Sequence, residues 1–293
     1  MGFDTAYEAI SEETDSGHRW AFGTGFSDPL AGVDTSVPAG VDGGDLATYC
    51  LMLGDDALIM SHRLQQWLTR APELEEETAL ANIALDLLGQ ARLLLTRAGT
   101  ADGSNRTEDD YAFFRTEREF RNVRLAEVTD ADFAGLVARL LVFSTWRLAL
   151  LLRLQDSADP VLAAVAEAGV KEITYHRDYA AQWTIRLGDG TDYSRQRMEA
   201  GLTAVAPLVA ELFVPSAVEE RLTGVAAGPA DLRPEFDVVI AQVLAEARLD
   251  WPAVAGLAGV SGQAGRDGVH TEAMGYLLAE LQSVARAMPG ATW

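Results

Sequence analysis

The sequence predicts an all-α protein, an antiparallel bundle of four long helices with additional helices towards the C-terminus. Three observations predict this fold class. Apolar residues recur at spacings of three and four through four long stretches, which is the period of one helix face. Short joints rich in Gly, Pro and Ala separate the stretches, so neighbouring helices are expected to run antiparallel. No run alternates apolar and polar residues over the length that a sheet needs.

The charge balance limits the partners that the protein can bind. Its 293 residues include 23 basic and 44 acidic side chains, a net charge of −21, and 48% of the residues are hydrophobic. Nucleic acid and anionic membranes attract patches of Lys and Arg, so we expect neither as a partner. The single cysteine, Cys50, excludes an internal disulfide and fits a reducing compartment.

The N-terminal region differs from the rest in composition. Residues 1–44 are rich in Gly, Ser, Asp and Thr without a sustained period, which predicts a flexible tail before a helical domain over residues 45–293. We expect that deletion to about residue 40 leaves folding intact. The chain begins with an acidic segment and shows no secretory signal, and no apolar run reaches the ~18 residues of a membrane span. The expected localisation is therefore cytoplasmic.

The first two long helices are predicted at residues 45–70 and 72–97. An apolar stripe that includes Leu53 and Trp67 marks the first helix. Pro72 suits the first position of the second helix, and the glutamates that follow it favour the positive end of a helix dipole. Gly99 is expected to stop this helix.

The remaining helices follow from caps and breakers. Thr107 caps a shorter helix that is rich in aromatic residues. The third long helix, Thr129–Gln155, is the most apolar of the chain. Asp159 and Pro160 begin the fourth long helix, which ends at Gly188. Further helices are predicted at about 193–213, 216–223, 234–249 and 271–288.

The second long helix carries a polar row in an apolar setting. Asn82, Asp86 and Gln90 repeat at spacing four, and apolar side chains flank the row on both sides. Asp86 is therefore predicted to point into the bundle, where a carboxylate is costly unless it is paired or bound to metal.

Carboxylates and histidines inside a four-helix bundle are typical of di-iron sites. In such a site two helices each give a Glu, and the other two each give a Glu-x-x-His pair. Here the first helix offers Asp55, Asp56 and His62, one of which could serve. The second offers Asp86, but Gly89 stands at the position of the histidine and the amide of Gln90 comes next. The first two helices therefore supply an incomplete ligand set.

The other two helices complete the comparison. The fourth helix offers Glu172, with His176 at spacing four instead of three, and residues 133–155 of the third contain no Asp, Glu, His or Cys. We therefore interpret the candidates as hydrogen-bonded core groups, whose charge Lys171, Arg92 or Arg147 could neutralise. These candidates form a degenerate site of Asp56, Asp86, Gln90, Glu172 and His176. The alternative hypothesis is an autonomous di-metal oxidase that uses Asp56, Asp86, Glu172 and His176.

Four segments, taken in order, resemble one family. They are LGDDALIMSHRLQQW, APELEEETALANIALDLLGQAR, KEITYHRDYAAQWTIRLGDGT, and the closing GVHTEAMGYLLAELQ with MPGATW. They closely resemble the C subunits of bacterial phenylacetyl-CoA epoxidase, a multicomponent oxygenase. The resemblance covers about residues 45–293 and leaves out the N-terminal tail.

The resemblance implies a ferritin-like fold and a subunit that has no catalytic, cofactor-binding or metal-ligating residues of its own. In that family the A subunit holds the di-iron centre, and the C subunit pairs with it as a structural partner. A small B subunit joins the complex, and a reductase with FAD and a 2Fe-2S cluster delivers electrons from NADPH. The expected function is a non-catalytic, structural subunit in aerobic phenylacetate breakdown.

Overall fold

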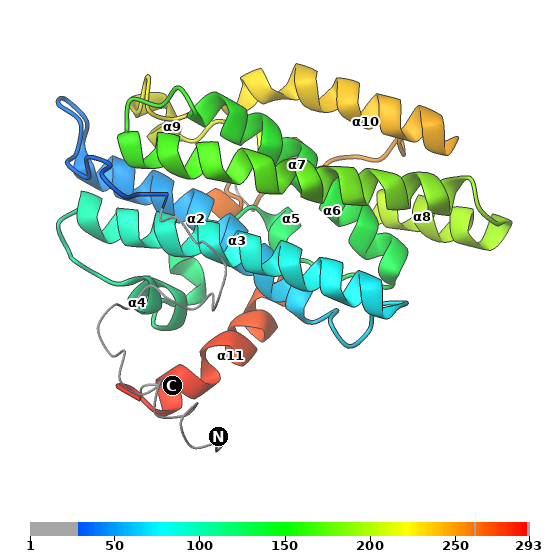
Figure 1. Ribbon diagram of the computed structural model, residues 1–293, viewed down its shortest axis with the longest axis horizontal. Coiled ribbons are helices and arrows are strands. Elements are labelled where there is room, and N and C mark those ends of the chain that lie inside the picture. The colour runs from blue at the N-terminus through cyan, green and yellow to red at the C-terminus, as the bar shows by residue number, and fades with distance from the viewer. Residues whose placement is uncertain (1–28, 261, 292–293) are drawn as a thin grey trace, which may run out of the picture. The chain divides into compact units, whose positions relative to one another are not determined.

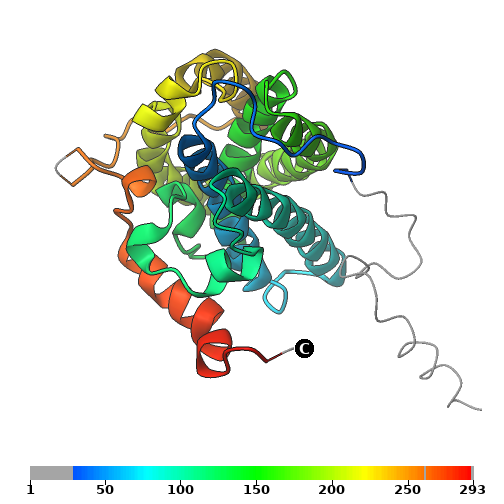
Figure 2. The same cartoon turned by 90° about the vertical axis from the view of Figure 1, so that its left-hand side faces the viewer.

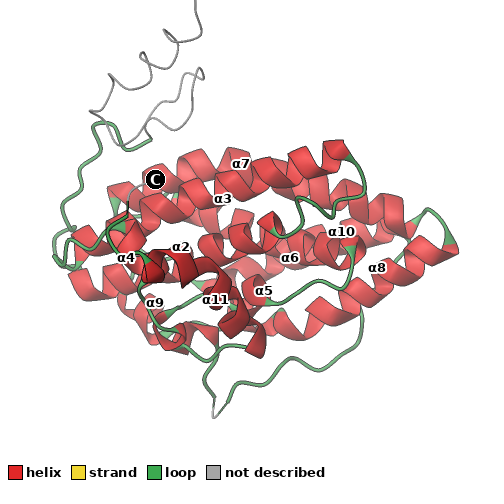
Figure 3. Cartoon of the chain, turned by 90° about the horizontal axis from the view of Figure 1, so that it is seen from below, coloured by secondary structure: helices red, strands yellow, loops and turns green. Residues whose placement is uncertain are grey.

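The computed structural model describes residues 29–260 and 262–291. The chain divides into two units, residues 1–31 and 32–293, and every described helix belongs to the second. Within the described ranges all regular secondary structure is helical, apart from one isolated bridge between Val260 and Gln263 (Figure 3). The all-α class predicted from the sequence is confirmed.

Four long helices dominate the second unit. They are α2 (Gly43–Gln65), α3 (Leu74–Ala101), α6 (Phe133–Leu154) and α7 (Pro160–Gly188). α2 packs along α3 and α6 packs along α7, while α3 also contacts α7 (Figure 1). Packing of apolar faces supplies most of the stability of such helices. The arrangement is compatible with the ferritin-like bundle that the resemblance implies.

Shorter helices surround the four long ones. They are α4 (Glu108–Phe113), η1 (Glu117–Glu119), α5 (Arg124–Glu127), α8 (Asp192–Val205), η2 (Ala206–Leu208), η3 (Ala210–Phe213), α9 (Ala217–Arg221), η4 (Pro229–Leu232), α10 (Arg233–Ala247), η5 (Gly265–Asp267) and α11 (Glu272–Ala287). α8 packs on α6, and α10 packs on α7. α11 lies at one edge of the helical unit, against α4, η1 and α5 (Figure 2).

Capping side chains determine where the central helices begin. Thr107 caps α4 and Asp159 caps α7, as predicted. α6 begins after Asp132 rather than near Thr129, because the Asp132 carboxylate accepts the Gly135 N–H at 2.9 Å.

Two predicted helix ends differ from the structure for local reasons. α3 continues through Gly99, where any side chain would meet the carbonyl oxygen of Arg106. This glycine therefore permits a close approach of the following loop and does not stop the helix. The helix predicted at 193–213 ends at Val205, and 3-10 turns carry the chain past Pro207.

Two helices, α3 and α6, are long and apolar enough to cross a membrane by length and composition, contrary to the expectation from the sequence. The most apolar window of α6 is 89% buried inside the protein, and Arg139 and Arg147 on this helix are 0% exposed. A core position therefore accounts for the apolarity of α6. The corresponding window of α3 is 44% buried, and Asn82 on that helix is exposed, as in an amphipathic helix.

Most of the predicted tail lies outside the described residues. Thr35 and Ser36 are described, and their carbonyl oxygens accept hydrogen bonds from Arg97 of α3 at 2.5 and 3.2 Å. Arg97 is 2% exposed and also pairs with Asp159 at 2.5 Å. Residues 35 and 36 thus satisfy a buried cation, so the dispensable part of the chain is expected to end before residue 35.

Deleting residues 1–40 should lower the melting temperature by several degrees more than deleting residues 1–31. Only the longer deletion removes Thr35 and Ser36, and a hydrogen bond to a charged group contributes about 1.5–3 kcal/mol. One kcal/mol corresponds to roughly 2–4 °C for a domain of this size. Differential scanning calorimetry of both truncated chains measures the difference. Equal melting temperatures would show that the contacts to Arg97 contribute nothing.

Candidate functional site

The polar row of α3 meets α7 over one helical turn. Asp86 Oδ2 lies 2.9 Å from His176 Nε2, and Gln90 Nε2 donates to Glu172 Oε2 at 2.8 Å. Because the two helices are antiparallel, Asp86 meets the later residue His176 and Gln90 meets the earlier residue Glu172. Asp86 and Gln90 are four residues apart on α3, and so are Glu172 and His176 on α7. The structure therefore brings four of the five candidate residues together.

The row extends from solvent into the core. Asn82 is exposed, the Asp86 side chain is 35% exposed, and Gln90 is 4% exposed. The expectation that Asp86 points into the bundle is therefore correct only in part. Partial hydration lowers the cost of its charge, so Asp86 needs no metal or full ion pair.

A guanidinium from α6 completes the inner end of the row. Arg147 Nε donates to Gln90 Oε1 at 2.9 Å, and Nη1 donates to the Leu53 carbonyl of α2 at 3.3 Å. Arg147 is 0% exposed, and burial lowers its pKa to about 10 against the attraction of Asp56 and Glu172. Its Nη2 has no hydrogen-bond partner within the described ranges. Arg147 remains charged at neutral pH and links α6 directly to α2 and α3.

The pKa values of Glu172 and His176, the two side chains of α7 that meet the polar row, both shift towards the neutral forms. Burial raises the pKa of Glu172 to about 7 and Asp86 adds to the effect, while Gln90 and Arg147 oppose it. Burial also lowers the pKa of His176, against the hydrogen bond with Asp86. The buried part of the group formed by Asp86, Gln90, Glu172 and His176, here called the α3–α7 row, is therefore poor in negative charge, although two of these four side chains are acidic.

Asp56 belongs to a different network. Its two oxygens accept hydrogen bonds from Arg266 Nη1 and Nη2 at 3.0 and 2.8 Å, and Oδ1 also accepts the Val123 N–H at 2.8 Å. Asp56 is 0% exposed, and burial raises its pKa although Arg266 opposes the shift. The neighbouring Asp55 is bound in the same way by Arg115. The adjacent carboxylates of α2 thus hold two later loops of the chain against this helix.

These contacts do not fit a di-iron centre. In the part of the chain that the structure describes, no group of three or more His, Cys, Asp and Glu side chains could hold a metal ion. Both oxygens of Asp56 are engaged by Arg266. α6, the helix without carboxylate or imidazole between residues 133 and 154, contributes the cation Arg147, which would repel a metal ion beside it.

Sequence reasoning named Arg147 only as one possible counter-charge and did not name Arg266. A signal for Arg147 exists, because it follows Arg139 by eight residues on the most apolar helix of the chain. Two arginines on one face of a buried helix require acceptors, and Arg139 finds Asp130. Arg266 gives no comparable signal, since it lies 210 residues from Asp56 in the short 3-10 helix η5.

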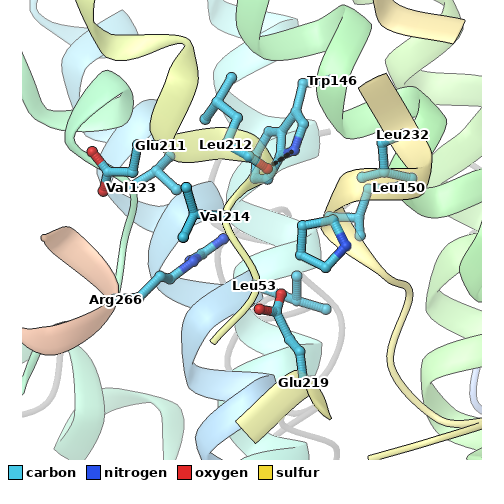
Figure 4. Close-up of a pocket in the computed structure, with 11 residues that line it drawn as sticks. Leu53, Val123, Trp146, Leu150, Glu211, Leu212, Val214, Glu219, Leu232 and Arg266 are labelled. Carbon is cyan, nitrogen blue, oxygen red and sulfur yellow. Dashed lines mark hydrogen bonds between the residues drawn. The ribbon is translucent and has the colours of Figure 1, made fainter. Parts of the chain in front are cut away.

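The pockets near these networks are small or apolar. A pocket beside Arg266 and Trp146 (Figure 4) has a volume of about 10 Å³, room for one water molecule. A pocket of about 280 Å³ lies between α2, α3, α4 and α11, and its lining is mostly apolar. The buried Nε2 atom of His62, which also lines this pocket, has no hydrogen-bond partner among the described residues. Neither pocket is lined by the four residues of the α3–α7 row.

Replacing Glu172 by Gln should stabilise the protein near pH 8 and change little near pH 4.5. The pKa of Glu172 is raised from 4.5 to about 7, so its contribution to stability is complete below about pH 4.5 and is lost as the pH rises through about 7. The neutral amide of Gln cannot ionise, so the variant avoids this loss. Its free energy of unfolding near pH 8 should be higher than that of the wild type by an amount on the order of 2–3 kcal/mol. Urea unfolding at both pH values measures it.

Glu167→Gln is the matched control, because Glu167 is exposed on the same helix. It should give no gain that depends on pH. Destabilisation by Glu172→Gln near pH 8 would instead mean that Arg147 holds Glu172 as an ion.

Two comparisons with known proteins agree. Residues 35–293 match the family described as "Phenylacetic acid catabolic protein". The chain is also similar to the C subunit of 1,2-phenylacetyl-CoA epoxidase from Escherichia coli (strain K12). The two are 40% identical over 250 residues, which is 85% of this chain and 99% of the relative. The matched region begins at Thr35, one of the two residues that bind Arg97. The chain therefore belongs to the phenylacetic acid catabolic protein family.

Proposed function

We propose that this chain is a non-catalytic, structural subunit of a multicomponent phenylacetyl-CoA epoxidase in aerobic phenylacetate catabolism. Its similarity to the C subunit of the E. coli enzyme, over 99% of that protein, supports a place in such a complex. The observation that carries the non-catalytic part is Arg147, because the cation that joins the long helices is a side chain of the protein itself.

A metal pair in a di-iron bundle draws together carboxylates from several helices. In this chain the Arg147 guanidinium supplies positive charge to Asp56 and Glu172 and donates hydrogen bonds to α2 and α3. The helices can therefore pack in this way without a metal. A bundle that keeps its packing without metal chemistry suits a protein that acts through its surface.

The proposed partners follow from the same proposal. They are a di-iron A subunit, a small B subunit, and a reductase whose FAD and 2Fe-2S cluster carry electrons from NADPH. No cofactor is assigned to this chain. The net charge of −21 favours neither nucleic acid nor an anionic membrane as a further partner, and we place the complex in the cytoplasm.

An autonomous di-metal oxidase is the second candidate, with Asp56, Asp86, Glu172 and His176 as ligands. The proximity of Asp86, Glu172 and His176 on facing turns of α3 and α7 favours it. It would require Asp56 to leave Arg266, with which it forms two hydrogen bonds in the core. Breaking such a buried pair costs about 3–5 kcal/mol.

Metal analysis separates the two candidates. The chain, purified after aerobic expression with added iron, should contain no stoichiometric iron or manganese, because Arg266 occupies both oxygens of Asp56 and the Arg147 guanidinium beside Gln90 would repel a metal ion. Inductively coupled plasma mass spectrometry provides the measurement. About two metal ions per chain, as in a di-iron bundle, and their loss in Glu172→Ala, would favour the oxidase.

Co-expression tests the pairing. Together with an iron-bearing chain of the same family, this chain should elute as a stable complex, since an obligate interface buries more than about 2,000 Å². Size-exclusion chromatography with light scattering, alone and after co-expression, measures the change in mass. Turnover of phenylacetyl-CoA in the presence of the reductase and the small B subunit should require this chain. Full-rate turnover without it would refute the proposed role.

A further inference from the structure

The segment GVHTEAMGYLL near the C-terminus contains a histidine that the proposed function does not use. His270 lies between α5 and the start of α11, and its side chain is 0% exposed. Nδ1 lies 2.7 Å from Glu127 Oε2, and Nε2 lies 3.2 Å from the carbonyl oxygen of Phe120. Both ring nitrogens therefore face oxygen acceptors.

This geometry selects one protonation state of His270. A neutral imidazole has one N–H and one lone pair, so one of the two contacts would place the lone pair against an oxygen. Only the imidazolium donates to both acceptors. Burial by itself lowers the pKa of His270, but Glu127, the Phe120 carbonyl and Glu117 together raise it above its usual 6.5.

Glu127 connects this imidazolium to α11. Its Oε1 accepts the Thr271 N–H at 2.5 Å, and its Oε2 also accepts Asn122 Nδ2 at 2.8 Å. Thr271 is the residue just before α11, so the carboxylate lies at the end of the helix where negative charge is favourable. The backbone carbonyl of Glu127 accepts Arg63 Nε at 2.7 Å, and Arg63 also donates to the Ala273 carbonyl at 2.8 Å.

The charged groups around His270 come from every helix packed near it. Glu127 on α5 and Glu117 on η1 favour the imidazolium. Arg63 on α2 carries the opposing charge and donates to backbone carbonyls and to Gln66. Glu272 on α11 is exposed and accepts from Tyr276. Arg121, just before α5, donates Nη1 at 3.0 Å to the Phe120 carbonyl oxygen, the same oxygen that faces His270 Nε2. Two carboxylates thus act on the buried ring, against the two guanidinium groups of Arg63 and Arg121.

We propose that His270 and Glu127 form a pH-sensitive clasp that fastens the N-terminal half of α11 to α5 and η1. When His270 loses its proton, one of its two contacts loses its donor, and that half of the helix opens more often. The C-terminal half is held differently, because Gln282 and Arg286 donate to backbone carbonyls of the 112–115 segment. These contacts do not titrate near neutral pH, so the two halves of α11 should respond differently.

The direction of the pH effect follows from proton linkage. The closed state binds the proton more tightly than the open state, in which His270 has its ordinary pKa near 6.5. Opening is therefore independent of pH below about 6.5. Between 6.5 and the raised value each pH unit should increase the opening equilibrium constant about tenfold, and above that value the effect should level off.

Hydrogen exchange of the full-length chain tests the clasp. Exchange rates between about pH 6 and 10, corrected for intrinsic exchange, should show that residues 272–279 lose protection as the pH rises above 6.5, by up to about tenfold per pH unit, until the loss levels off above the raised pKa of His270. Residues 280–287 and α8 should not. In His270→Gln, and in Glu127→Gln if the first variant folds poorly, the protection of residues 272–279 should no longer depend on pH. His62→Gln is the matched control and should behave as the wild type.

Imidazole NMR gives a second readout. The resonance lost in His270→Gln should titrate above pH 6.5, whereas burial lowers the pKa of His62 and His176, so their resonances should titrate below it. Titration of His270 below 6.5 would overturn the proposal, as would protection of residues 272–279 that does not change with pH. A uniform loss of protection over all helices would also overturn it, because the pH effect would then belong to global unfolding.

Discussion

The hydrogen bond between Arg147 and Gln90 is the contact on which the packing of the long helices depends. Gln90 accepts from Arg147 through its oxygen and donates to Glu172 through its nitrogen, so one amide joins α6, α3 and α7. The amide has only one orientation that serves both neighbours. Gly169 on α7 leaves room for it, since any side chain there would meet the Gln90 amide and Leu151. The distance of α7 from α3 and the hydrogen bonds of the Gln90 amide therefore both depend on the small size of Gly169.

Other buried arginines work in a similar way. Four paired guanidinium and carboxylate groups connect segments that are distant in sequence: Arg97 with Asp159, Arg115 with Asp55, Arg124 with Glu211, and Arg266 with Asp56. A fifth pair, Arg139 with Asp130, joins α6 to the segment just before it. A buried ion pair is weak support for stability, because its desolvation offsets much of the attraction. Its geometric demand is strong, however, since the planar guanidinium fits a carboxylate in few orientations. These pairs therefore select one arrangement of loops and helices.

The fold class and most helices could be predicted because their signals are local. The 3.6-residue period and caps such as Thr107 and Asp159 act within a few residues. The same local logic placed Asp86, Gln90, Glu172 and His176 on facing helices. It could not separate Asp56 from them, because a helical period reveals an inward-facing side chain and not the cation that reaches it. Arg266 reaches Asp56 from η5, a short 3-10 helix that no pattern in the sequence connects to α2.

The distance along the chain between Asp56 and Arg266 also bears on how the protein is made. A ribosome that adds about 5–20 residues per second needs roughly 10–40 s to synthesise the 210 residues between them. During this time the Asp56 carboxylate lacks its ion pair with Arg266, and it favours water or a bound proton over the interior. All four long helices are complete by Gly188, yet Asp56 has only the charge of Arg147 and the Val123 N–H as partners until Arg266 has left the ribosome. The last buried ion pair of α2 can therefore form only when nearly the whole chain has been synthesised.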